Sequence, residues 1–250
     1  MARRSLRAPN LAGVAATIHL HPTAPLAERV LLPGDPGRAL TLAQALLDKP
    51  RMFNHNRGLW GYTGTAADGA QLTIQSTGMG GPSAAIVISE LADLGARWLL
   101  RAGTCGALDP ALALGELVIA TEALATDGAS RALGAPARVP ASEELLAALS
   151  AAAPDGAGAR RAPVASTDLF YEHREKLGRR WARAGAVAVE METATLFALA
   201  ARRGLRAAAV LVVSDQLHPV RTRIDPAGLA EAERRMGTLA ARALAALPSA

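Results

Sequence analysis

The sequence predicts one α/β domain in three layers, with helices on both sides of a central mixed sheet. Short apolar runs of strand length alternate with segments of helical periodicity, and no linker-like break interrupts them. The segments around Asp68-Gly69 have the signature of a β-hairpin, so antiparallel as well as parallel strands are expected. With 250 residues, 50% of them hydrophobic and 20% charged, the chain can bury one large core.

The composition excludes several classes of protein. Cys105 is the single cysteine, so no internal disulfide is possible, and a reducing, cytoplasmic location is expected. Residues 1–10 are rich in arginine but precede no signal-type apolar segment, and no apolar run is long enough to span a membrane. No basic helix with interleaved aromatics and no zinc-type spacing occurs, so a nucleic-acid partner is not expected. The net charge of +5 fits either a bias toward arginine or attraction of a small anion.

The chain is expected to begin with a flexible segment over residues 1–18, followed by the domain over 19–250. Residues 29–32 form a short apolar strand, and the Pro-Gly-Asp-Pro-Gly-Arg sequence of 33–38 forms a turn. A helical pattern follows over 39–47. This strand–turn–helix unit is a first candidate for an anion site.

The next segments give the hairpin and a second strand–helix unit. A polar turn at 54–58 precedes the two hairpin strands, which are expected at 62–66 and 71–75. Apolar residues at helical spacing predict a helix over 82–94, and a strand follows over 97–100.

The second half of the chain continues the alternation. Strands are expected at 115–120, 162–166, 186–189 and 205–213. Helices are expected at 142–152 with Ser142 as the cap, after residue 192 as far as 202, and at 224–247. Residues 127–140, with many Gly and Pro, are expected to form a surface loop, and residues 168–181 a polar, partly helical segment.

Arg101 is the strongest single candidate for binding an anion. It lies inside an apolar run, and a buried arginine requires a negative partner. The Gly-Thr-Cys-Gly sequence of 103–106 is expected to turn there and to present the Thr104 hydroxyl and bare backbone N–H groups. Arg38 and Arg57 stand in other polar or glycine-rich turns, and three guanidinium groups would saturate a phosphate. Taken singly, however, those two are more often solvated surface residues.

Acidic residues follow two of the expected strands. Glu190 and Glu192 lie two residues apart in extended chain, so their side chains share a face and could accept hydrogen bonds from vicinal hydroxyls. The same acids would also favour the first turn of a helix. Ser214-Asp215 ends the strand of 205–213, where Asp215 is either an acid or a turn residue.

Three further candidates stay open from the residues alone. Phe170-Tyr171 could stack on a planar base or pack in the core, and His19 and His21 could reach a ligand or belong to the surface. Cys105 has no histidine near it in sequence, which favours a packing role over a nucleophilic one.

Taken together, these motifs resemble the nucleoside phosphorylase family that contains hexameric purine nucleoside phosphorylases and uridine phosphorylases. The resemblance covers the chain from about residue 19 to the final helix, and its order of motifs matches the family. The matching stretches are 32–38 (Leu-Pro-Gly-Asp-Pro-x-Arg), 56–58 (Asn-Arg-Gly), 76–83 (Ser-Thr-Gly-Met-Gly-x-Pro-Ser), 101–107 (Arg-x-Gly-Thr-Cys-Gly-Ala), 168–171 (Asp-x-Phe-Tyr), 189–192 (Val-Glu-Met-Glu) and 213–215 (Val-Ser-Asp).

The resemblance implies a reversible phosphorolysis, in which a nucleoside and inorganic phosphate give a free base and ribose 1-phosphate. Phosphate is then the co-substrate, and no metal or cofactor is expected. Asp215 and Arg101 would be catalytic, with Asp215 donating a proton or hydrogen bond to N7 of a purine and Ser214 supporting it. The implied phosphate ligands are Gly34, Arg38, Arg57, Arg101 and Thr104. The implied nucleoside ligands are His19, Met79, Cys105, Gly106, Phe170, Val189, Glu190, Met191, Glu192, Ser214 and Asp215.

The resemblance also implies an oligomer, expected as a hexamer built as a trimer of dimers. Arg57 and His19 would be supplied by a neighbouring subunit, with His21 as the alternative to His19. The active unit is therefore expected to be at least a dimer.

Asp215 favours the purine branch of the family. The Arg101-x-Gly-Thr motif and the segments 76–78 and 127–130 also resemble the uridine branch, but residues 172–176 lack the Gln-x-Arg pair with which uridine enzymes recognise the pyrimidine. Arg221 and Arg223 are candidates for the arginine that assists Asp215. The alternatives are a uridine phosphorylase, a nucleosidase of the same fold, or a nucleoside-binding protein without turnover; the arginine set argues against the nucleosidase.

Overall fold

The computed structural model describes residues 17–153, 159–171, 175–218 and 220–248. The flexible segment expected at 1–18 lies outside the described residues except for its last two positions. None of the described helices is long and apolar enough to cross a membrane.

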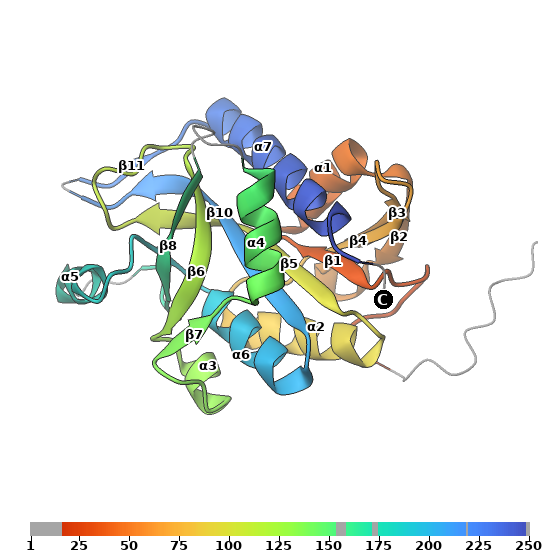
Figure 1. The fold of residues 1–250 in the computed structure, drawn as a ribbon, viewed down its shortest axis with the longest axis horizontal. Helices are drawn as coiled ribbons and strands as arrows, with labels where there is room; N and C mark the ends of the chain where they lie inside the picture. Colours follow the sequence, from red (N-terminus) through yellow and green to blue (C-terminus); the bar gives the residue numbers. More distant parts are fainter. Residues whose placement is uncertain (1–16, 154–158, 172–174, 219, 249–250) are drawn as a thin grey trace, which may run out of the picture.

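The described strands join in one mixed sheet, as the sequence predicts (Figure 1). The hairpin is confirmed by antiparallel pairing of β3 with β4, while β1 runs parallel to both β4 and β5. The strands are β1 (Arg29–Leu32), β2 (Asp48–Asn54), β3 (Gly61–Thr65), β4 (Gln71–Gln75), β5 (Trp98–Ala107), β6 (Leu117–Ala125), β7 (Arg138–Pro140), β8 (Ala159–Ser166), β9 (Ala188–Glu190), β10 (Arg206–Gln216) and β11 (Thr222–Arg223).

Part of this sheet closes on itself, which the sequence does not indicate. β5 pairs with β10, β10 with β6, β6 with β8, β8 with β9, and β9 again with β5. The order β1-β4-β3-β2 extends from β5 as an open wing. The closed ring leaves β5, β9 and β10 without a free edge, and these three strands carry half of the site residues expected from the sequence.

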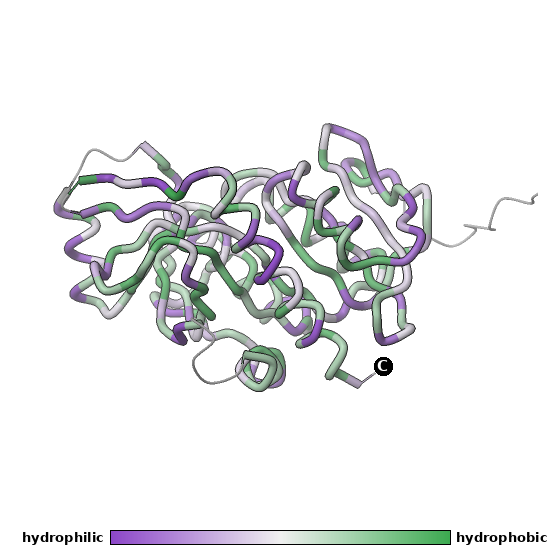
Figure 2. The backbone as a smooth tube through the Cα atoms, turned by 90° about the horizontal axis from the view of Figure 1, so that it is seen from above, coloured by the Kyte–Doolittle hydropathy of each residue, from purple (hydrophilic) through white to green (hydrophobic). Residues whose placement is uncertain are grey.

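All the described helices except α5 form the two outer layers, in agreement with the predicted three-layer architecture. Helices α1, α4 and α7 pack together on one side, and α2, α3 and α6 pack together on the other (Figure 1). Much of the chain through the middle of the molecule is hydrophobic (Figure 2), and Val210 to Val213 of β10 are fully buried. The helices are α1 (Pro36–Leu46), α2 (Gly81–Asp93), α3 (Gly128–Ala132), α4 (Glu143–Ala152), α5 (Glu175–Arg183), α6 (Thr193–Arg203) and α7 (Pro226–Ala245).

The expected turn at 103–106 is wrong, because β5 continues through it to Ala107. β10 pairs with β5 along this whole length, and these ladder hydrogen bonds hold the glycines in extended conformation. Gly103 has a different function from a turn glycine: a Cβ there would lie 2.7 Å from Cζ of Arg101. The glycine therefore makes room for the buried guanidinium.

Other boundaries differ because side chains cap helices that sequence periodicity alone misplaces. α1 begins at Pro36 rather than 39, since the Asp35 carboxylate accepts from the backbone N–H of Arg38 at 2.6 Å. Asp127 likewise caps α3, so residues 127–140 contain a short helix and β7 instead of loop alone. Ser142 precedes α4 as predicted, but its hydroxyl accepts from Ala207 N–H rather than from the helix.

Candidate active site

A cavity of about 390 Å³ lies where β1, β5 and β10 end, next to the end of β9. β5 runs parallel to both β1 and β10, so their carboxyl ends meet at one place. Most residues singled out from the sequence line this cavity: Gly34, Arg38, Met79, Arg101, Thr104, Cys105, Gly106, Phe170, Val189, Glu190, Met191, Glu192, Ser214 and Asp215. His19 and Arg57 do not line it.

Arg101 is the buried cation of this cavity, and two carboxylates hold it. Its Nε donates to Oε2 of Glu190 at 3.0 Å, and its Nη2 lies 2.5 Å from Oε2 of Glu192. Burial tends to lower the pKa of Arg101, but the two glutamates raise it overall, so the guanidinium stays charged. Nη1 makes no hydrogen bond to any described residue and lies on the side of Gly34. That nitrogen is the donor left for a ligand.

Glu190 uses its carboxylate to hold the protein together. Besides Arg101, it accepts hydrogen bonds from the Ser166 hydroxyl and from the backbone N–H groups of Glu192 and Thr193. It therefore caps the start of α6 and orients Arg101 at the same time. Its position in the cavity wall agrees with the sequence, and its oxygens are already occupied by protein donors.

Glu192 is the carboxylate with capacity for a ligand. One oxygen accepts from the backbone N–H of Gly80, and the other is paired with Arg101. Burial raises the pKa of Glu192; Arg101 acts in the opposite direction, and the neighbouring carboxylate of Glu190 raises it further. Because one guanidinium serves two carboxylates here, Glu192 gains from additional hydrogen-bond donors such as sugar hydroxyls.

Arg38 lines the cavity from the start of α1, and Glu233 of α7 holds it. Its Nε and Nη2 both lie 2.7 Å from Oε1 of Glu233. The hydroxyl of Thr104 makes no hydrogen bond to a described residue and is available on the same cavity wall. The phosphate ligands expected within one chain are thus gathered around one space.

Asp215 is placed by an irregularity of β10. The strand register shifts between Val213 and Asp215, so Ser214 is an extra residue opposite β5. The Ser214 hydroxyl donates to Asp215 Oδ2 at 2.8 Å. Arg221 Nε donates to Asp215 Oδ1 at 2.9 Å, and Arg223 Nε lies 3.3 Å from the same oxygen.

Arg221 joins the acid to the aromatic wall of the cavity. Its guanidinium carbon lies 4.5 Å from the ring centroid of Phe170, in a cation–π arrangement. Phe170 in turn packs edge-on against Tyr171, with centroids 5.1 Å apart. Both aromatic side chains are at least half exposed, so the structure favours a ring at the cavity mouth over a core role. Met79, 86% exposed, lies at the rim as well.

Cys105 is buried, and burial is the main cause that raises the pKa of its thiol. Its Sγ lies 3.6 Å from the carbonyl oxygen of Val212. A thiol that stays protonated is no nucleophile, so the buried position of Cys105 agrees with the packing role that the sequence favours.

His19 lies in a separate group with Asn54, Asn56 and Glu90, and Arg57 is the residue after Asn56; we call these five residues the outer cluster. The His19 Nδ1 is 2.7 Å from Glu90 Oε1, and the Asn56 side chain donates to the His19 carbonyl at 2.9 Å. Arg57 is exposed and has a left-handed backbone with φ of 57°. His21 is exposed, and its backbone N–H donates to Asn54 Oδ1.

The structure adds residues that the sequence patterns did not single out. Glu233 looks like an ordinary solvated position of an amphipathic helix, and only the packing of α7 against α1 brings it to Arg38. Thr167, Leu169 and Leu217 also line the cavity. Leu217 immediately follows β10 and packs close to Gly106, a contact that no local signal indicates.

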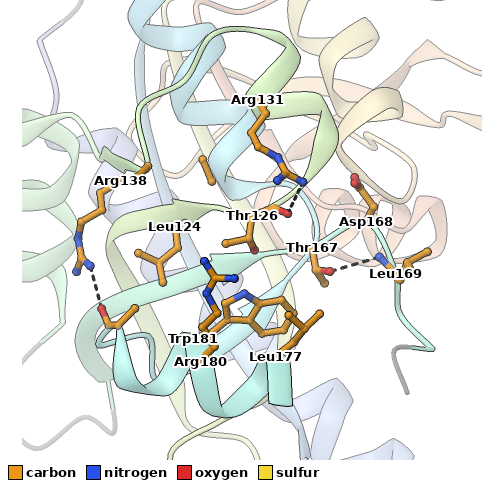
Figure 3. Close-up of a pocket in the computed structure, with 13 residues that line it drawn as sticks. Leu124, Thr126, Arg131, Arg138, Thr167, Asp168, Leu169, Leu177, Arg180 and Trp181 are labelled. Atoms are coloured by element: carbon orange, nitrogen blue, oxygen red, sulfur yellow. Dashed lines mark hydrogen bonds between the residues drawn. The ribbon is translucent and has the colours of Figure 1, made fainter. Parts of the chain in front are cut away.

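A second, larger cavity of about 560 Å³ lies beside α5 (Figure 3). Leu177, Arg180 and Trp181 of α5 form one wall, and Arg131 lies across from them. It shares only Thr167 and Leu169 with the first cavity, and none of the site residues expected from the sequence lines it. Among the described residues that line it, Asp168 is the one acidic side chain, and it accepts from Gly128 N–H. The first cavity is therefore the candidate active site.

Known proteins resemble this chain over most of its length. The profile of the phosphorylase superfamily matches residues 28–247. The chain is 41% identical over 197 residues to a DeoD-type purine nucleoside phosphorylase of Caldanaerobacter subterraneus, covering 77% of this chain and 84% of the relative. It is 39% identical over 193 residues to a guanosine phosphorylase of Halorubrum lacusprofundi, covering 76% and 79%. A crystal structure of uridine phosphorylase from Vibrio fischeri, complexed with 6-hydroxy-1-naphthoic acid, is similar with a TM-score of 0.80 at 27% identity, covering 91% and 96%.

Proposed function

The chain belongs to the phosphorylase superfamily, and we propose that it is a purine nucleoside phosphorylase. It cleaves purine ribonucleosides and deoxyribonucleosides reversibly with inorganic phosphate, giving the free base and (deoxy)ribose 1-phosphate, in nucleoside salvage. One observation carries the proposal: Arg101 with Glu192, and Asp215 with Arg221, stand in the wall of the same cavity. The relatives named as DeoD-type purine nucleoside phosphorylases, at about 40% identity, support it.

The phosphate end of the reaction is assigned to the cations and to the ends of β1 and β5. Phosphate lies between Arg38, Nη1 of Arg101 and the Thr104 hydroxyl, near the backbone of Gly34. Glu192 accepts from the 2′- and 3′-hydroxyls of the ribose, and Met191 and Met79 flank the sugar. One phosphate oxygen then faces C1′.

The base end is assigned to the residues beyond the sugar. Phe170 and Val189 pack on the purine, with Cys105 and Gly106 along its edge. A phosphate oxygen forms the new bond to C1′ as the C1′–N9 bond breaks, and the bonding electron pair moves into the base. Asp215 delivers a proton or hydrogen bond to N7, which neutralises that charge, and Ser214 and Arg221 hold the carboxyl group in place.

The reaction so proposed uses inorganic phosphate as co-substrate and needs no metal or organic cofactor. The protein is proposed to act in the cytoplasm as a homo-oligomer, a hexamer arranged as a trimer of dimers. His19 and Arg57 reach the neighbouring subunit's cavity, because both lie outside the cavity of their own chain and in one outer cluster.

A substrate panel tests the proposal. Inosine, adenosine, guanosine and uridine are incubated with and without phosphate, and the released base is measured. Phosphate-dependent release from purine nucleosides is expected. Faster cleavage of uridine would favour the uridine phosphorylase to which the solved structures point. Release that persists unchanged without phosphate would establish a nucleosidase instead.

A further inference from the structure

The contact between Arg38 and Glu233 joins two parts of the chain that lie 195 residues apart. Both side chains are largely buried, 11% and 16% exposed. Arg38 Nε donates a hydrogen bond to Oε1 of Glu233, and Nη2 lies 2.7 Å from the same oxygen in the ion pair. The carboxylate therefore grips one edge of the guanidinium group.

The ion pair with Glu233 leaves the opposite edge of the Arg38 guanidinium available for a ligand. A guanidinium group has five N–H donors; the one on Nε donates to Glu233, and the edge formed by Nε and Nη2 faces that carboxylate. The remaining donors, on Nη1 and Nη2, belong to a side chain that lines the cavity. This is the edge whose paired N–H groups match two oxygens of a phosphate.

We propose that Glu233 is a positioning residue that holds Arg38 ready for phosphate and thereby sets the affinity for it; the inference rests on the proposed phosphorolysis. A free arginine side chain loses about 2 kcal/mol of rotamer entropy when it is immobilised. Arg38 has lost that freedom before the ligand arrives, so phosphate binding does not have to supply it. The α7 helix, through Glu233, thus contributes to a site formed otherwise by β1, α1 and β5.

A competing effect has the opposite sign. The negative charge of Glu233 weakens the attraction between Arg38 and a phosphate dianion. Two substitutions separate position from charge. Glu233→Gln keeps the length and an acceptor oxygen but removes the charge, whereas Glu233→Asp keeps the charge but is shorter by one methylene and loses its reach to Arg38.

The experiment measures KM for phosphate at saturating inosine, KM for inosine at saturating phosphate, and kcat. Glu233→Asp is expected to raise KM for phosphate about five- to tenfold, with KM for inosine and kcat within about twofold. Glu233→Gln is expected to stay within about threefold of the unmodified protein. Glu231→Asp is the matched control, because Glu231 lies on the same helix and, among the described residues, pairs with exposed Arg234 alone. It is expected to leave all three constants unchanged.

The reverse order, in which Gln alters KM for phosphate and Asp does not, would overturn positioning in favour of charge. Equal effects on KM for phosphate and KM for inosine, or no effect in either variant, would overturn it too. Since Asp and Gln differ little from Glu in size, both variants are expected to fold; a cooperative thermal transition verifies this. A lack of phosphate dependence in the unmodified protein would reject the proposed function itself, which is a different result.

Discussion

The cavity wall around Arg101 and the outer cluster around His19 use similar side chains in different settings. In the cavity wall, one guanidinium is buried between Glu190 and Glu192. In the outer cluster, Arg57 is exposed and outside its own cavity, although the sequence motifs place both arginines at phosphate. The difference teaches that a motif identifies the residue type a site requires, while burial and partners distinguish the arginine that lies in the cavity of its own chain from the one that does not.

Arg101→Ala removes the buried cation of the cavity wall and should have the largest effect of the substitutions considered. It leaves the buried carboxylates of Glu190 and Glu192 unpaired, which is expected to lower the free energy of unfolding by about 3–5 kcal/mol. It also removes a phosphate donor, so the phosphate requirement should rise steeply. Urea unfolding and phosphate titration of the rate measure both effects. Arg206→Ala, which breaks an exposed pair with Glu144, should cost less than about 1 kcal/mol.

Unaltered phosphate dependence together with unaltered stability in Arg101→Ala would remove this arginine from the site. The Arg206 variant shows whether a loss of unfolding free energy follows from removing any paired arginine or only from removing the buried Arg101.

Asp215→Asn tests the part of the same cavity where the base is proposed to bind. The amide cannot supply a proton, so turnover should fall by about 10²–10⁴-fold. Adenosine should lose more than inosine or guanosine, because 6-aminopurines depend more on protonation at N7. Steady-state rates on the three nucleosides measure this. An equal loss for all three would contradict the proton-donor role.

Arg57→Ala tests whether the outer cluster serves the cavity of a neighbouring subunit. Alone, it should weaken phosphate binding to the neighbouring cavity without affecting the stability of its own chain. The Arg57→Ala and Asp215→Asn proteins are then unfolded together and refolded as a mixture, which should restore activity. Half of the dimers contain one chain of each variant, and each such dimer has one intact site, made of Asp215 from one chain and Arg57 from the other. About a quarter of the unmodified activity is expected at equal mixing.

The refolded mixture is compared with each variant refolded separately. No recovery beyond the sum of the two would place Arg57 in the site of its own chain, against the geometry, or outside the site altogether.

Glu90→Gln should have the smallest effect, and it depends on pH. Burial tends to raise the pKa of Glu90, but hydrogen bonds from Leu20, His19 and Ile18 lower it overall. Because this folded pKa lies below the unfolded value of about 4.3, the carboxylate stabilises the fold above that pH and ceases to do so as the pH falls through the folded pKa. The substitution should cost about 1–2 kcal/mol at pH 7.

Urea unfolding at pH 7 and at a pH below about 4 should show that cost shrinking in acid. A cost that is the same at both values would mean that the charge of Glu90 has no part in holding residues 18–20. Glu28→Gln, in an exposed pair with Arg97, is the control.

The sequence predicts the alternation of elements, the hairpin and most of the residues that line the first cavity, because these depend on local patterns and on motifs that are contiguous in the chain. It does not predict that β5 continues through 103–106: a glycine pair indicates a turn locally, and only pairing with β10 overrides it. The contact of Glu233 with Arg38 is not predicted for the same reason, since it depends on the tertiary packing of α7 against α1. The pairing of β9 with β5 that closes the ring is a nonlocal event of the same kind.

That closed ring has a mechanical consequence for the chemistry. A strand in an open sheet can slide or peel at its edge, but a strand in a ring moves only if hydrogen bonds break on both sides at once. Arg101 on β5, Glu190 on β9 and Asp215 on β10 are therefore mounted on a frame that resists shear. Arg221, by contrast, lies between β10 and β11, outside this frame.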